Sequence, residues 1–108
     1  MVKAADAYVK AKLTLYPENE GGRTHYILTG FRPNHVFEYV ESQILATYIG
    51  EIQFDASEKV EPGEEKEVSV RFLMTPELKN FLQVGRKWWL HEGARKIGEA
   101  IVLQYNCP

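Results

Sequence analysis

The stretch Lys87–Gln104 reads KWWLHEGARKIGEAIVLQ, and its pattern predicts two strands joined by a tight turn. Successive side chains of a strand point to opposite faces of the sheet. In the first strand this places Trp88 and Leu90 on one face, and Trp89 and His91 on the other. We therefore expect Trp88 to fill the interior of the protein. We expect Trp89 to face outward, where a large aromatic side chain marks a contact surface.

The connection between these two strands is the short segment Glu92–Arg95. Its Gly93 can take the positive φ angle that a hairpin turn requires. The last strand follows as Lys96–Gln104. Three aliphatic residues define the inner face that we expect for it: Ile97, Ile101 and Leu103.

The same period of two occurs at three earlier places in the chain: Tyr8–Tyr16, Leu45–Phe54 and Val68–Phe72. In the second of these, four residues are expected on the inner side: Ala46, Tyr48, Ile52 and Phe54. Gly50 also falls on that side, which indicates a bulge or close packing. Several short strands with turn residues between them indicate an all-β sandwich or barrel.

Two segments depart from this period. Thr75 and Pro76 have the features of a helix start, namely a capping hydroxyl and a proline suited to the first helical position. Apolar residues follow at helical spacing, so we expect one or two helical turns there: Leu78, Phe81 and Leu82. The segment Val36–Leu45 fits a helix about as well as a strand, and its conformation stays open.

Length and charge limit the function classes. The chain has 108 residues and a net charge of −2. This length fits a single domain, residues 1–108, whereas a dedicated nucleic-acid-binding protein is usually basic. The charge is also unevenly distributed. Glu51–Glu67 has seven acidic residues against two lysines, and Lys79–Lys96 has five basic residues against one glutamate.

Motifs of catalysis and cofactor binding are absent from the sequence. It has no glycine-rich phosphate-binding loop, its histidines lack metal-site spacing, and its single Cys107 has no partner cysteine. We expect neither an enzyme nor a protein that binds GTP, a metal or another cofactor. No segment has the roughly 20 apolar residues needed to cross a bilayer. The first residues lack an apolar run of signal-peptide length, so we expect a cytoplasmic protein without a membrane segment.

Three groups of residues carry a resemblance to a known family. They are EGGR at Glu20–Arg23, followed by Tyr26 and by GFRP at Gly30–Pro33; the turn Pro62-Gly63-Glu64; and Gly85–Val102. In this order and spacing they resemble the C-terminal, third domain of elongation factor Tu, over about residues 8–104. The resemblance implies a closed, mainly antiparallel six-stranded barrel with at most one or two short helical segments. It does not extend to the GTPase domain of the family, so GTP hydrolysis is not implied.

The resemblance also implies two classes of partner. In the family this domain contacts the T stem of aminoacyl-tRNA, and it packs against the GTPase domain and the nucleotide-exchange factor. The Glu-Gly pair of the family's late turn matches Glu92 and Gly93, and a glutamine after its Arg-Pro pair becomes Asn34. Thr75 and Ile49 replace a lysine and a threonine of the family. We therefore expect tRNA affinity to be weak and salt-dependent.

Our leading hypothesis is a non-catalytic, translation-related protein that binds a protein partner through one face; self-association is a further option. The candidate binding residues belong to the late hairpin and an earlier strand: Asn34, Trp89, Glu92, Gly93, Arg95 and Lys96. The alternative is an RNA-binding module that retains affinity for the tRNA stem through Glu92, Gly93 and the basic stretch Arg86–Lys96. A single basic face would favour RNA, whereas acidic residues among the basic ones would favour a protein partner.

Overall fold

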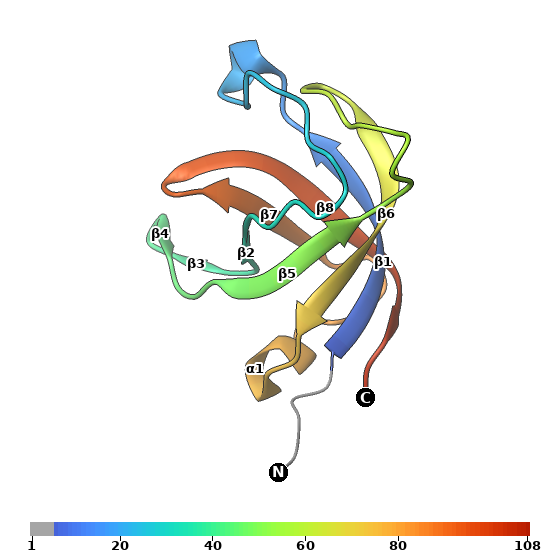
Figure 1. Ribbon diagram of the computed structural model, residues 1–108. Coiled ribbons are helices and arrows are strands. Elements are labelled where there is room, and N and C mark those ends of the chain that lie inside the picture. The colour runs from blue at the N-terminus through green and yellow to red at the C-terminus, as the bar shows by residue number, and fades with distance from the viewer. Residues whose placement is uncertain (1–5) are drawn as a thin grey trace.

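The computed structural model describes residues 6–108, which form a closed barrel of six strands (Figure 1). Around the barrel the strands follow the order β1 (Asp6–Leu15), β6 (Glu65–Leu73), β5 (Tyr48–Gln53), β2 (Asn34–Val36), β7 (Lys87–Glu92) and β8 (Arg95–Asn106), and β8 pairs with β1. Neighbouring strands are antiparallel. The prediction of an all-β, closed, mainly antiparallel six-stranded barrel is confirmed. The short elements are η1 (Glu18–Glu20), β3 (Tyr39–Val40), β4 (Gln43–Ile44) and α1 (Pro76–Lys79).

Strand β1 shows how the sequence produces the barrel wall. Its small and aliphatic residues are buried at every second position: Ala7, Val9, Ala11, Leu13 and Leu15. The residues between them include Lys10 and Lys12, which are exposed. Closure of the barrel directs the apolar face of each strand into one common core.

A polar group lies at the centre of this core. His35 and Trp88 are both fully buried, and the indole Nε1–H of Trp88 donates a hydrogen bond of 3.0 Å to Nδ1 of His35. Nε2–H of His35 donates to the carbonyl oxygen of Gly50 at 3.0 Å. Burial lowers the pKa of His35 to about 4, although the bond to Gly50 opposes this shift. The expected interior position of Trp88 is confirmed.

Gly50 is required because the core approaches its backbone closely. A Cβ atom at this position would lie 2.9 Å from Nε2 of His35 and 2.9 Å from Cδ1 of Phe72. Protein interiors are packed too densely to absorb such a contact without displacement. The close packing predicted for Gly50 is therefore confirmed.

The inner face predicted for the last strand is wrong beyond Ile97. Ile97, Ala100 and Val102 are buried, whereas Ile101 is half-buried and Leu103 is exposed. The register between β7 and β8 shifts after the pair Leu90↔Gly98, because the next pair is His91↔Lys96. Ile97 is the extra residue of this β-bulge. A bulge moves the following residues to opposite faces, so Ile101 and Leu103 point outward.

Helix α1 begins as the sequence predicts. The hydroxyl of Thr75 accepts a hydrogen bond of 3.2 Å from the backbone N–H of Leu78, and Pro76 occupies the first turn. Leu78 is fully buried. Phe81, just after the helix, stacks on Phe37 of the core with 5.2 Å between the ring centroids.

Among residues 6–108, no helix is long and apolar enough to cross a membrane.

The chain between β2 and β5 forms a small hairpin, residues 38–45, which we call the arm. Strands β3 and β4 pair within it, and its turn residues Glu41 and Ser42 have φ angles of 51° and 65°. The segment Val36–Leu45, left open by its sequence, is thus extended. The arm projects from the side of the barrel (Figure 1).

The predicted strand Leu45–Phe54 begins later than expected, at Tyr48. Ala46 was expected on its inner side but is exposed. The reason is that the chain is still returning from the arm at this point and has not yet joined the barrel wall. Ile52 is fully buried, and Phe54 packs against the core as predicted.

Candidate functional site

The six candidate binding residues lie on neighbouring strands of the barrel. On β2, Asn34 pairs with His91 of β7, and the remaining candidates lie on β7, on β8 and in the turn between them. This side of the barrel also carries the arm (Figure 1). The structure therefore brings Asn34 next to the five candidates of residues 89–96, from which it is distant in the sequence.

Trp89 points outward but is only partly exposed, because the arm covers it. The ring of Tyr39 in β3 contacts Trp89 edge-on, with 5.3 Å between the ring centroids. The ammonium group of Lys96 lies 5.4 Å from the centre of the Trp89 ring and 4.7 Å from that of Tyr39. Cation–π attraction of this kind holds a lysine against aromatic faces. The arm and the barrel wall are joined through these three side chains.

His91 lies beneath the arm and is only 4% exposed. Its Nε2 atom is 2.5 Å from the hydroxyl oxygen of Tyr39, and its buried Nδ1 atom has no hydrogen-bond partner among the described residues. Burial lowers the pKa of His91, and the positive charge of Lys96 lowers it further, while the backbone of Ala94 and Gly93 opposes the shift. The lowered pKa favours a neutral imidazole, whose Nε2 can accept a hydrogen bond from the Tyr39 hydroxyl.

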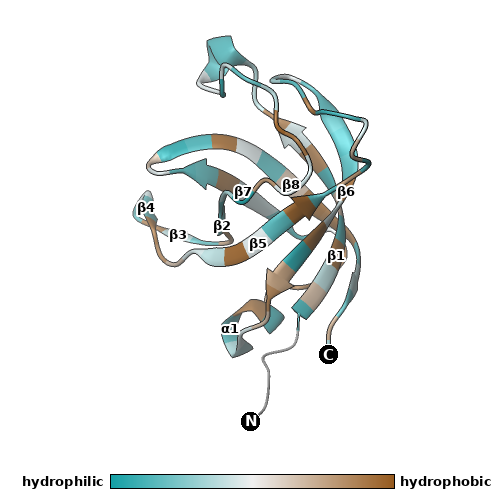
Figure 2. Cartoon of the chain, viewed as in Figure 1, coloured by the Kyte–Doolittle hydropathy of each residue, from teal (hydrophilic) through white to brown (hydrophobic). Residues whose placement is uncertain are grey.

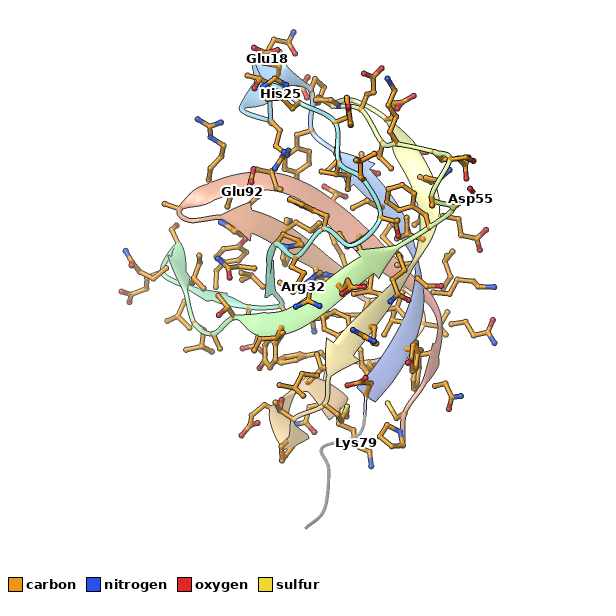
Figure 3. The ribbon with its side chains drawn as sticks, viewed as in Figure 1. Glu18, His25, Arg32, Asp55, Lys79 and Glu92 are labelled. Atoms are coloured by element: carbon orange, nitrogen blue, oxygen red, sulfur yellow. The ribbon has the colours of Figure 1, made fainter. Side chains whose placement is uncertain are left out.

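The turn between β7 and β8 is built on Gly93, whose φ angle is 58°. The positive φ angle predicted for this residue is confirmed. Next to it lies Glu92, which Figure 3 labels at the β7–β8 hairpin. The carboxylate of Glu92 forms a salt bridge of 2.5 Å with the guanidinium of Arg23. A second ion pair holds Arg32 against Glu51 at 2.6 Å, further along the wall. Glu92 is thus already occupied by a residue 69 positions earlier in the chain.

The basic stretch Arg86–Lys96 does not form one positive face. Arg86 donates a hydrogen bond of 2.5 Å to the carbonyl oxygen of Phe37, and Lys87 forms a salt bridge of 3.1 Å with Glu99. Lys87 lies opposite Ile101 in the β7–β8 register, while Arg95 lies opposite Glu92 at the other end of the hairpin. Acidic residues therefore separate the basic ones.

The arm exposes a group of apolar side chains that the sequence reasoning missed. Val40 is 51% exposed, Leu45 is 58% exposed and Ile44 is 37% exposed. Ile49, at the start of β5, is 65% exposed. Figure 2 shows the apolar residues of the arm continuing into the loop that leads to β5. The available signal was the segment VESQIL at residues 40–45, in which a turn separates apolar residues.

Within residues 6–108, no group of three or more histidine, cysteine, aspartate or glutamate side chains is placed to hold a metal ion. No protein-family model matches the chain, and no curated protein matches it.

Proposed function

We propose that this chain is a non-catalytic protein-binding module whose contact face is the arm together with the adjoining β7–β8 hairpin. The observation that carries the proposal is the exposure of Val40 and Leu45 on one face of a projecting hairpin. Contiguous exposed apolar side chains are unfavourable in water and typically mark sites of interaction with another protein. The resemblance to the third domain of elongation factor Tu, a barrel that contacts other macromolecules without catalysis, supports the same conclusion.

The packing beneath the arm adds to this support. Tyr39 and Trp89 are half-buried aromatic residues with polar edges, and such residues are enriched at protein interfaces. They lie on the inner side of the arm, where the ammonium group of Lys96 contacts both rings. A partner that contacts both the arm and the adjoining β7–β8 hairpin would therefore meet the apolar side chains of the arm and the polar edges of these aromatic residues, a combination that is usual at an interface.

The distribution of charge makes RNA the weaker candidate. A phosphate backbone is bound by lysine and arginine side chains that are free to contact it. Here Lys87 and Arg23 are already paired with Glu99 and Glu92. The acidic residues between the basic ones would also repel a phosphate backbone.

The proposal is tested by affinity capture on the immobilised chain, with and without nuclease. We expect the wild type to retain proteins after nuclease treatment, and the double variant Val40→Ser, Leu45→Ser to lose them. Val84→Ser is the matched control, because Val84 is 70% exposed on the loop between α1 and β7. Material that nuclease removes and that the double variant still retains would contradict a protein partner and favour RNA.

A further inference from the structure

The two faces of the arm differ. Tyr39 and Ile44 form one cross-strand pair, and Val40 and Gln43 form the next. Because side chains alternate along a strand, Val40 and Gln43 share the face opposite Tyr39. The Tyr39 face packs against Trp89. The outer face therefore presents Val40, and Leu45 continues it after β4.

The charged residues of the arm are both acidic. Glu38 and Glu41 are both exposed, and the sequence from residue 33 to residue 58 contains no lysine or arginine. Two basic side chains contact residues 37–39. Arg86 is bonded to the carbonyl oxygen of Phe37, and Lys96 lies over the ring of Tyr39. The outer face thus combines apolar side chains with acidic ones.

Three kinds of partner could bind the outer face of the arm, and its acidic and apolar side chains favour one of them. A nucleic acid would bring phosphates towards Glu38 and Glu41, which repel them. A second copy of the chain, related by a two-fold axis, would place the same acidic residues of both copies in one interface, because such an interface uses the same patch twice. Like charges facing each other across an interface are unfavourable. A positively charged polypeptide is attracted by the same residues.

We propose that the outer face of the arm binds a polypeptide segment that carries lysine or arginine beside apolar side chains. This inference rests on the proposed function and specifies the chemistry of the partner. The apolar side chains of the segment would cover Val40 and Leu45, and its cations would lie beside Glu38 and Glu41. Binding should weaken with rising salt, because exposed ion pairs are screened.

The test uses two synthetic peptides, one alternating valine and lysine and the other alternating valine and glutamate, titrated into the full chain. We expect only the valine–lysine peptide to bind. Its affinity should fall by about tenfold in Val40→Ser, Leu45→Ser, since tenfold corresponds to about 1.4 kcal/mol of buried apolar surface. The charge reversal Glu38→Lys, Glu41→Lys should weaken it at least as much. Glu64→Lys, Glu65→Lys is the matched control, a pair of exposed glutamates at the start of β6.

The outcomes separate this inference from the proposed function. If the serine variant weakens binding but the arm charge reversal does not, the partner chemistry is wrong and the arm remains a docking surface. If neither variant changes the affinity, or if neither peptide binds at about 1 mM, the inference fails, and the capture experiment alone then decides the proposed function. A dimer in sedimentation that the serine variant abolishes would replace the basic segment with a second copy.

Discussion

The buried His35 predicts that the protein loses stability on mild acidification. Its pKa of about 4 in the folded state lies below the ordinary value of 6.5. The unfolded chain therefore binds more protons than the folded protein as the pH falls below 6.5. Stability from this residue is fully present above pH 6.5 and is lost as the pH falls towards 4.

The loss of stability follows from the difference between the pKa of His35 in the folded and in the unfolded protein. One pKa unit corresponds to about 1.36 kcal/mol, so the full loss is about 3 kcal/mol, of which about 2 kcal/mol is lost between pH 7.5 and pH 5. Carboxylates whose pKa is lowered in the folded state change the stability below this window. The pKa of Glu51, for example, is lowered by hydrogen bonds from Gln53 and Arg32. Protonation of histidines therefore dominates the change in stability between pH 7.5 and pH 5.

The measurement is urea unfolding at a series of pH values for the wild type and for His35→Gln. Glutamine cannot titrate, and its amide can still donate towards the Gly50 carbonyl, so the variant should be less stable at pH 7.5 but should lose less stability at pH 5. The variant His91→Gln measures separately the contribution of the other buried histidine. The pKa of His91 is also lowered, so this residue changes the stability in the same direction. Equal pH slopes in the wild type and His35→Gln would refute the assignment of this proton to the core.

Five further substitutions test the packing. Trp88→Ala should cost about 3–5 kcal/mol of unfolding free energy, as large-to-small core changes do, whereas Trp89→Ala should cost about 1–2 kcal/mol; a reversed order in urea melts would place the wrong tryptophan inside. Gly50→Ala should cost about 1–3 kcal/mol through overpacking, and an unchanged melting temperature would contradict the close approach at this residue. Ser42→Gly should stabilise the arm by about 1 kcal/mol, because glycine tolerates positive φ, and slower amide exchange in the arm would show it. Tyr39→Phe should speed exchange in the arm by about fivefold, the loss of one hydrogen bond of about 1 kcal/mol; unaltered exchange would mean that its hydroxyl does not hold the arm.

Much of the barrel could be predicted from local sequence patterns. Alternation of side chains depends only on the extended backbone, so the strand around Val9 and the inward position of Trp88 were predictable without any knowledge of their neighbours. The start of α1 was predictable for the same reason, because Thr75 caps a backbone N–H only three residues away. The candidate residues of the β7–β8 turn also lie close together in the sequence, around Gly93.

Features that depend on contacts between residues distant in the chain could be seen only in the tertiary structure. The bulge at Ile97 arises from the register between β7 and β8, and it reversed the orientation expected for Leu103. The arm is fixed to the barrel by contacts such as the hydrogen bond between Tyr39 and His91, which is 52 residues away. His91, which the sequence predicted to lie on an outer face, is buried beneath the arm. Local alternation assigns a residue to a face, but what covers that face depends on the closure of the barrel and on the segment that crosses it.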